Sequence, residues 1–313
     1  MSSIAIAGAG LIGRSWAYVF ARAGMDVRVW DPKPDVLGRL DADIRAMHEK
    51  AILHDCAGAD PQGLPGRIRA CARLEDALEG ASLVQENGPE ILEIKQSLFA
   101  DLDRLAQKET ILASSSSALM ASAFCSGLEG QARCLVGHPV NPPHLVPVVE
   151  ISPMPETAPA VVEQAAALYR AAGQVPVRLH QEVDGFVLNR LQAVVLAEAL
   201  RLISEGVVSP EGLDDTIRHG LGRRWAFMGP METIHLNAPG GILDYLERYG
   251  PTMARLADDA ARGEAFSPEA ARRAAEGFHS DDAEKIRARQ EWRDGELAAL
   301  DRHLRNRTSL KTA

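Results

Sequence analysis

The chain has 313 residues, 46% of them hydrophobic and 25% charged, so it is long enough for two domains of ordinary globular composition. Its 43 acidic and 34 basic side chains give a net charge of −9, which disfavours a nucleic-acid or anionic-membrane surface and favours catalysis on small molecules. No basic leader precedes the first apolar run, no stretch reads as a membrane span, and the four cysteines lack metal-ligand spacing. We therefore expect a soluble, cytoplasmic protein with reduced thiols and no metal site.

The first fifty residues predict a dinucleotide-binding unit. A short apolar run leads into the sequence GAGLIG, and a helical pattern follows. In this context Gly8 permits a tight turn, Gly10 lets a pyrophosphate approach the helix start, and Gly13 allows close helix–strand packing. A second strand ends at Asp31, whose carboxylate suits the ribose hydroxyls and repels a 2′-phosphate. NAD is therefore expected rather than NADP, with Lys33 offsetting part of that repulsion. The alternative is a glycine turn without a cofactor.

Strands and helices alternate through the following residues. Helices are predicted at about 36–54, 91–105 and 159–172, strands near 68, 82–86, 110–113 and 175–179, and a loop at 58–66. This alternation predicts an α/β fold with a doubly wound, mostly parallel sheet. From about residue 184 the apolar spacing is helical, beginning with 187–204. We therefore expect a Rossmann-like NAD-binding domain at 1–183. An all-helical substrate and dimerisation domain should follow at 184–313, with a solvated helix and tail from 281 to 307.

A proline-rich segment, GHPVNPPHLVPVVEI at 137–151, interrupts the middle of the chain. Its four prolines exclude a helix and an ordinary central strand. His138 and Glu150 lie on strand-like stretches at its two ends, where a turn would bring them together. Histidine can take the proton of an alcohol as hydride leaves, and a carboxylate fixes its tautomer. The pair predicts the acid–base couple of a dehydrogenase; a hydrogen-bonded structural histidine is the alternative.

Several separate sequence blocks resemble the 3-hydroxyacyl-CoA dehydrogenase family, in the same order and over nearly the whole chain. They are GAGLIGRSWA (8–17), QENGPEILEIKQSLFADLD (85–103), SSSSAL (114–119), the segment 137–151, VDGFVLNRLQ (183–192) and GLGRRWAFMGPMETIHLNAPGG (220–241). Within the family, the chain is most similar to the branch that contains λ-crystallin, which is L-gulonate 3-dehydrogenase. The resemblance implies an NAD-dependent enzyme that forms a homodimer through its helical domain.

The resemblance also implies roles for individual residues. The catalytic positions fall on Ser117, His138, Glu150 and Asn189. His138 would act as base in oxidation and as acid in reduction, while Ser117 and Asn189 bind the reacting oxygen. The cofactor contacts, besides the three glycines, fall on Leu11, Ile12, Asp31, Glu90, Lys95 and Asn141. The alternatives are a buried polar helix residue for Asn189, a capping acid for Glu90 and a solvated lysine for Lys95.

Two departures from the acyl-CoA members of the family bear on the substrate. Those members carry a lysine-rich arm that meets the phosphates of CoA, whereas residues 34–57 here hold five acidic and three basic side chains, which would repel a polyanion. The block GRRW places Arg223 and Arg224 beside a tryptophan, and an arginine fork binds a carboxylate. We prefer Arg224 as this substrate contact; a surface or dimer-interface arginine is the alternative.

These observations predict a small free L-3-hydroxy acid, such as L-gulonate, as the substrate. A 3-hydroxyacyl-CoA and L-carnitine are the alternative substrates. The alternative to an enzyme is a non-catalytic NAD-binding protein with a structural role, like that of a crystallin.

Overall fold

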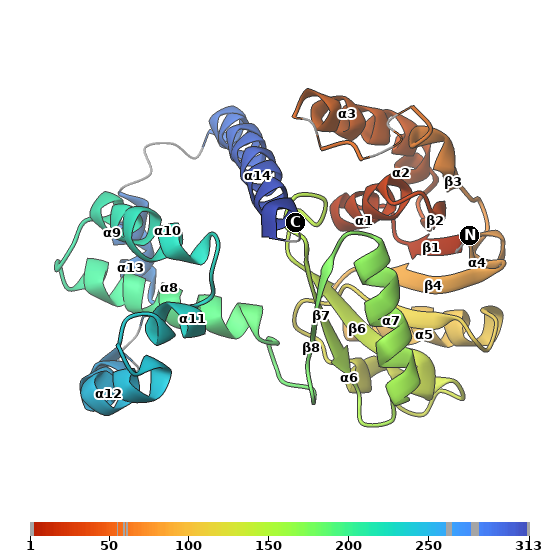
Figure 1. Ribbon diagram of the computed structural model, residues 1–313. Coiled ribbons are helices and arrows are strands. Elements are labelled where there is room, and N and C mark those ends of the chain that lie inside the picture. The colour runs from red at the N-terminus through yellow and green to blue at the C-terminus, as the bar shows by residue number, and fades with distance from the viewer. Residues whose placement is uncertain are drawn as a thin grey trace. The chain divides into compact units, whose positions relative to one another are not determined.

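Two units make up the computed structural model, which describes residues 3–54, 56–58, 60, 62–260, 265–276 and 282–311. Unit 1 contains residues 1–187 together with 292–313, and unit 2 contains residues 188–291. Figure 1 shows the sheet of unit 1 and the helices of unit 2. None of the helices in the described ranges is long and apolar enough to cross a membrane.

An eight-stranded sheet forms the centre of unit 1, in the order β3-β2-β1-β4-β5-β6-β7-β8 (Figure 1). The strands are β1 (Ser3–Ala7), β2 (Asp26–Trp30), β3 (Ile68–Ala70), β4 (Ala81–Glu86), β5 (Ile111–Ser114), β6 (Cys134–Pro139), β7 (Val148–Pro153) and β8 (Val175–Arg178). All neighbours pair in parallel except β6 and β7, which form an antiparallel hairpin. The chain runs outward from β1 to β3 and returns to β4 on the other side of β1. The predicted doubly wound α/β fold is confirmed, and its strand order reverses at β1 and β4, where such sheets bind ligands.

Helices cover both faces of this sheet. They are α1 (Leu11–Arg22), α2 (Pro34–Gly38), α3 (Leu40–Leu53), α4 (Leu74–Leu78), α5 (Leu92–Leu105), α6 (Ala121–Cys125) and α7 (Pro159–Ala171), with 3-10 turns at Pro65–Arg67 and Gln131–Arg133. Alternate residues of β1 face opposite sides, as the period of a strand requires. Ile4 and Ile6 pack in a core with α1, α3 and α7, whereas Ala5 and Ala7 pack in a second core with α4, α5 and α6.

Unit 2 is helical, and no strand follows Arg178 in the described part of the chain. Its elements are α8 (Leu188–Ser204), α9 (Pro210–Thr216), a π-helical turn (Ile217–Leu221), α10 (Gly222–Trp225), α11 (Pro230–His235), α12 (Gly241–Ala260) and α13 (Pro268–Ala275). The last helix, α14 (Ala283–Lys311), begins in unit 2 and continues into unit 1. The prediction of a solvated terminal helix is wrong in part, because Ala298 is 1% exposed and packs with Leu297 in the core of unit 1. The domain division expected at residue 184 stays a prediction.

Candidate active site

The glycine-rich turn lies at the carboxyl end of β1 and leads into α1. Gly8 has a φ of +100°, and a Cβ there would lie 2.9 Å from the backbone of Asn87. A Cβ on Gly13 would lie 1.8 Å from the carbonyl oxygen of Gly8, so only glycine lets α1 pack this close. At Gly10 a Cβ would meet no atom within 4 Å. The turn therefore leaves open space beside the amide groups at the start of α1, where a pyrophosphate binds.

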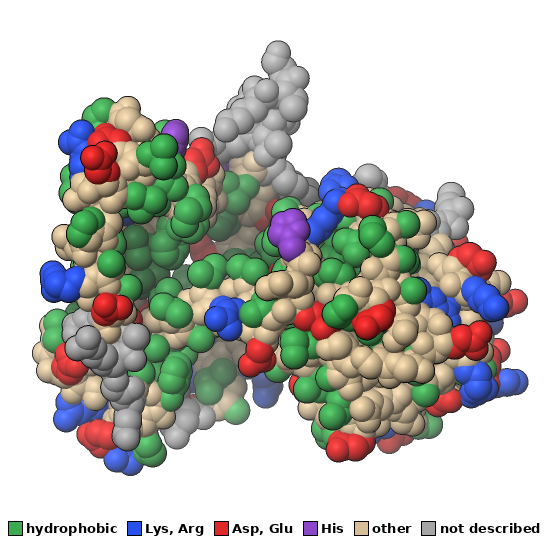
Figure 2. All heavy atoms as spheres, turned by 90° about the horizontal axis from the view of Figure 1, so that it is seen from below, with side chains coloured by type: hydrophobic (Ala, Val, Ile, Leu, Met, Phe, Trp, Pro, Cys, Tyr) green, Lys and Arg blue, Asp and Glu red, His purple; other side chains and the backbone are tan. Residues whose placement is uncertain are grey.

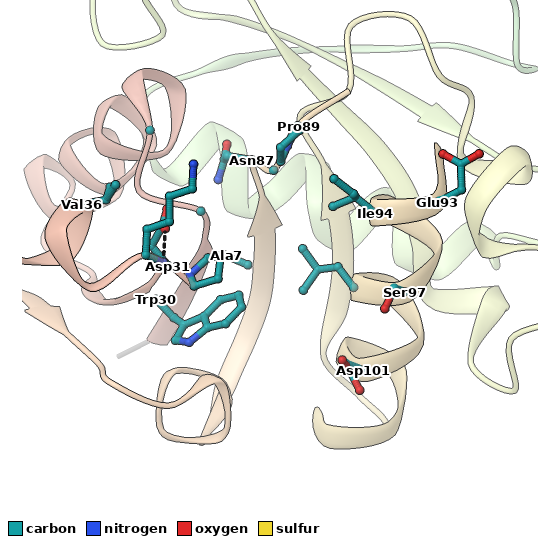
Figure 3. Close-up of a pocket in the computed structure, with 16 residues that line it drawn as sticks. Ala7, Trp30, Asp31, Val36, Asn87, Pro89, Glu93, Ile94, Ser97 and Asp101 are labelled. Atoms are coloured by element: carbon teal, nitrogen blue, oxygen red, sulfur yellow. Dashed lines mark hydrogen bonds between the residues drawn. The ribbon is translucent and has the colours of Figure 1, made fainter. Parts of the chain in front are cut away.

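A pocket of about 690 Å³ opens between this turn and α5 (Figure 3). Figure 3 shows Trp30 and Asp31 on one side of it and Ile94 and Ser97 of α5 on the other. The Asp31 carboxylate accepts hydrogen bonds from the backbone N–H of Ala9 at 2.7 Å and of Lys33 at 2.8 Å. These two donors fix the carboxylate at the end of β2, where it can accept from ribose hydroxyls. The open glycine turn, the apolar walls of the pocket and the fixed carboxylate of Asp31 together fit NAD.

Three further predicted cofactor contacts lie around the turn and in the hairpin loop. Leu11, in the first turn of α1, is 61% exposed, and Ile12 beside it is half-buried. Asn141 is exposed in the loop between β6 and β7. Their contacts with the cofactor stay predictions.

Glu90 holds the serine-rich loop that follows β5. Its carboxylate accepts hydrogen bonds from the backbone N–H groups of Ser117 at 3.1 Å, Ala118 at 3.2 Å and Leu119 at 3.0 Å. The Ser116 hydroxyl also donates to it, and the Ser117 hydroxyl lies 3.4 Å away. Burial raises the pKa of Glu90, but these hydrogen bonds outweigh burial and lower the pKa to about 2. Glu90 therefore fixes the loop that carries Ser117, while its contact with the cofactor stays a prediction.

Lys95 points into the protein rather than into solvent. Its side chain is 1% exposed, with Nζ 2.8 Å from a carboxylate oxygen of Glu86 and 3.3 Å from the Ser114 hydroxyl. The alternative of a solvated helix lysine is therefore wrong. Removing one partner of such a buried ion pair costs about 3–5 kcal/mol, because a charge is left unpaired. The pair ties α5 to the ends of β4 and β5, and a contact between Lys95 and the cofactor stays a prediction.

The hairpin of β6 and β7 brings His138 and Glu150 together. The two residues are partners in the register of the strands, and His138 Nδ1 lies 2.9 Å from a carboxylate oxygen of Glu150. Both side chains are buried. The exclusion of a central strand was too strict, because Pro139 ends β6 and the next three prolines lie in the turn. With Nδ1 bonded to the carboxylate, Nε2 is the nitrogen left to exchange a proton with a substrate.

Phe186 and Val187 complete the surroundings of this pair. The backbone N–H of Val187 donates to the other Glu150 oxygen at 2.9 Å, and the Phe186 ring lies 5.2 Å from the His138 ring between centroids. Phe186 has a φ of +50°, which is rare outside glycine and costs on the order of 1 kcal/mol or more. Sequence reasoning gave Phe186 no role. Its only signal was its place in the block VDGF, directly after a glycine.

Asn189 and Arg224 belong to unit 2, so the structure does not group them with the pair in unit 1. Asn189 is half-buried in the first turn of α8. Arg224 lies in α10, directly after the π-helical turn, a feature found often at functional sites. Within the described ranges, no side chain pairs with the guanidinium groups of Arg223 and Arg224. A contact of either arginine with a substrate anion stays a prediction.

The class of protein follows from two family comparisons. The family model for the NAD binding domain of 3-hydroxyacyl-CoA dehydrogenase matches residues 3–183. The family model for the C-terminal domain of 3-hydroxyacyl-CoA dehydrogenase matches residues 185–279. The chain belongs to the 3-hydroxyacyl-CoA dehydrogenase family. Its cofactor is NAD, and membership makes it an NAD-dependent oxidoreductase acting on CH–OH groups.

Individual relatives narrow this assignment. The lambda-crystallin homolog of Bos taurus is 48% identical over 304 residues, which cover 95% of this chain and 94% of that protein. L-carnitine dehydrogenase of Streptomyces griseus is 38% identical over 254 residues, which cover 80% of this chain and 74% of that protein. The solved structure of an NAD-dependent 5-formyl-3-hydroxy-2-methylpyridine 4-carboxylic acid 5-dehydrogenase matches with a TM-score of 0.84 at 28% identity, covering 97% of this chain and 99% of that one. The predicted resemblance to the λ-crystallin branch is confirmed.

Proposed function

We propose that this protein oxidises the 3-hydroxyl group of a small free L-3-hydroxy acid, such as L-gulonate, with His138 and Glu150 as its acid–base pair. The observation that carries the proposal is the buried 2.9 Å contact between these two side chains. Because β1, β4, β5 and β6 run parallel, the carboxyl end of β6 lies at the same sheet edge as the glycine turn. His138 is thus at the edge that binds NAD.

Each side chain of the proposed site has one task. His138 Nε2 takes the hydroxyl proton of the substrate in oxidation and returns it to the oxygen in reduction. NAD, when bound, would supply the hydride acceptor for oxidation and, as NADH, the hydride donor for reduction. Glu150 accepts a hydrogen bond from Nδ1, which keeps the tautomer and stabilises the imidazolium. Ser117 donates a hydrogen bond to the reacting oxygen, and the family resemblance assigns the same task to Asn189.

The acidic arm supports a free acid rather than an acyl-CoA. The arm consists of α2 and α3, and its Arg45 already pairs with Asp41 at 2.9 Å. Its Asp43 binds Arg14 of α1. An arm of this charge offers little to the phosphates of CoA. The similar solved structure and the L-carnitine relative are, by their names, enzymes of small molecules, and Arg224 would hold the carboxylate of such a substrate.

A substrate panel tests the proposal. We expect the purified protein to oxidise L-gulonate or a related short L-3-hydroxy acid with a higher kcat/KM than 3-hydroxybutyryl-CoA, measured by NADH absorbance. The opposite order would make the protein an acyl-CoA enzyme. L-carnitine as the best substrate would support the second candidate function, an L-carnitine dehydrogenase, which the 38% identity of this chain to such an enzyme favours. Tight NADH binding without turnover of any compound would indicate the non-catalytic alternative.

Arg224→Met adds a test of the carboxylate contact. It should raise the KM of the hydroxy acid by at least about tenfold, because a charge pair with the substrate is lost, and should leave the KM of NAD unchanged. Arg218→Met is the matched control, since Arg218 lies in the same segment but already pairs with Asp215.

We also infer that two copies of the chain associate through unit 2. Figure 2 shows hydrophobic side chains across the surface of the unit 2 helices. Leu191 and Val194 of α8 are 61% and 67% exposed, and Leu243 and Leu246 of α12 are exposed as well. Apolar faces of this kind are typical of permanent interfaces. Light scattering should give the mass of a dimer; a monomer at assay concentration would contradict the inference.

A further inference from the structure

A buried amide at the end of β4 connects segments that are far apart in the sequence. The side chain of Gln85 is fully buried. Its Nε2 donates to the Ser115 hydroxyl at 2.7 Å and to the carbonyl oxygen of Gly137 at 3.1 Å, and its Oε1 faces the Tyr169 hydroxyl. Because a carbonyl can only accept, the atom facing Gly137 must be the amide nitrogen. Oε1 must then accept from Tyr169, so the orientation of Gln85 is fixed by its partners.

The Ser115 hydroxyl is the second centre of this network. It accepts from Gln85 and, at 3.1 Å, from the indole N–H of Trp16, and it lies 2.7 Å from Asn87 Oδ1. Two donors already point at this oxygen, so its proton must go to Asn87. Asn87 in turn donates through Nδ2 to the backbone carbonyl of Gln85 at 2.7 Å. Every hydrogen bond in the network therefore has one possible direction.

The partners of these two side chains belong to the segments that carry the cofactor site and the proposed chemistry. Trp16 lies on α1, which follows the glycine turn, and Asn87 lines the NAD pocket. Ser115 precedes Ser117 by two residues, and Gly137 directly precedes His138. The fit at Gly137 is tight, because a Cβ there would lie 2.1 Å from the Tyr169 hydroxyl oxygen.

We propose that Gln85 and Ser115 are positioning residues, which hold Ser117 and His138 at fixed places relative to the NAD-binding turn. The inference rests on the proposed function for the roles of Ser117 and His138. Neither Gln85 nor Ser115 acts on the substrate. A displacement of about 1 Å at a reacting group can lower a rate by about a hundredfold. Two side chains that join α1, the end of β4, the serine-rich loop, β6 and α7 therefore matter for turnover.

Loss of the Ser115 hydroxyl should affect turnover more than binding. Ser115→Ala leaves the indole N–H of Trp16 and one N–H of Gln85 without an acceptor in a buried place, and the loops must move to satisfy them. We expect kcat per NADH-binding site to fall at least about tenfold, with the KM of the hydroxy acid and the Kd of NADH within about threefold of the wild type. A purely structural role would reduce the number of NADH-binding sites and leave kcat per site unchanged.

Two further variants complete the experiment. Tyr169→Phe removes only the donor to Gln85 Oε1, keeps the packing of the ring, and should lower kcat in the same direction by a smaller factor. It decides the question if Ser115→Ala does not fold. Ser126→Ala is the control, because Ser126 is exposed and, among the described residues, its hydroxyl bonds only to the backbone carbonyl of Ser122 in the preceding helix α6.

Hydrogen–deuterium exchange separates this inference from the proposed function. In Ser115→Ala, the amides of residues 115–119 and of Gly137, His138 and Val140 should exchange faster than in the wild type, whereas those of α5 should not. If the wild type oxidises no compound of the panel, the proposed function fails, yet the exchange pattern still decides the positioning role. Wild-type exchange in these two segments, or wild-type kcat in both Ser115→Ala and Tyr169→Phe, would overturn it.

Discussion

Lowering the pH should destabilise unit 1 through His144, which lies in the loop between β6 and β7. Its ring meets the edge of Tyr18, with 6.1 Å between centroids, and its Nδ1 is buried without a hydrogen-bond partner among the described residues. Burial, followed by the positive charge of Arg22, lowers the pKa of His144 to about 4, against a smaller opposite effect of Asp294. The folded protein therefore accommodates the neutral ring.

The sign and size of the effect follow from this pKa. The unfolded chain binds a proton near the ordinary value of 6.5, whereas the folded protein resists protonation until about pH 4. The free energy of unfolding is thus unaffected above pH 6.5 and falls as the pH drops from 6.5 toward 4. At 1.36 kcal/mol per unit of pKa, the free energy of unfolding falls by about 3 kcal/mol over this range of pH.

The variant His144→Phe isolates this contribution. It keeps an aromatic ring beside Tyr18 but cannot titrate, so its stability relative to the wild type should improve by about 3 kcal/mol between pH 7 and pH 4. Urea unfolding followed by tryptophan fluorescence, to which Trp16, Trp30 and Trp292 of unit 1 contribute, measures the difference. His180→Gln, at an exposed histidine of the same unit, should retain the wild-type pH dependence. Equal pH dependence in His144→Phe and the wild type would refute the reasoning.

Three shorter predictions concern the cofactor, the chemistry and the C-terminus. Asp31→Ala should shift the ratio of kcat/KM toward NADP by at least about tenfold, and equal use of both cofactors by the wild type would contradict the role of Asp31. His138→Ala should lower kcat at least about a hundredfold while NADH binding changes little, and Glu150→Gln should act similarly. Near-normal turnover in either variant would exclude His138 and Glu150 as the acid–base pair. A chain that ends at Glu291 removes Ala298 from the core of unit 1 and should lower its melting temperature by several degrees in calorimetry; an unchanged temperature would show that this packing adds nothing.

The fold of unit 1 could be predicted because its signals are local. The glycine turn and the alternation of strands and helices are periodic patterns that read directly along the chain. The five-residue helices α4 (Leu74–Leu78) and α6 (Ala121–Cys125) were missed, because one turn of helix gives no period to detect.

The candidate site was predictable only in part. His138 and Glu150 are twelve residues apart on one hairpin, so a short turn is enough to pair them. Gln85 and Ser115 depend on partners up to 99 residues away in sequence, and no local pattern marks those contacts. The alternative of a solvated Lys95 failed for the same reason: a lysine on a helix is normally solvated, and only the fold places Glu86 beside it.

The return of the chain to unit 1 through α14 bears on how the protein is made. During synthesis, residues 1–187 emerge before residues 188–291, yet the core they form includes Ala298, which lies beyond unit 2 in the sequence. More than a hundred residues of unit 2 are therefore synthesised between Val187 and the part of α14 that supplies Ala298 to unit 1. Domains usually fold as they emerge. Here the core of unit 1 gains Ala298 only after the whole of unit 2 has been synthesised.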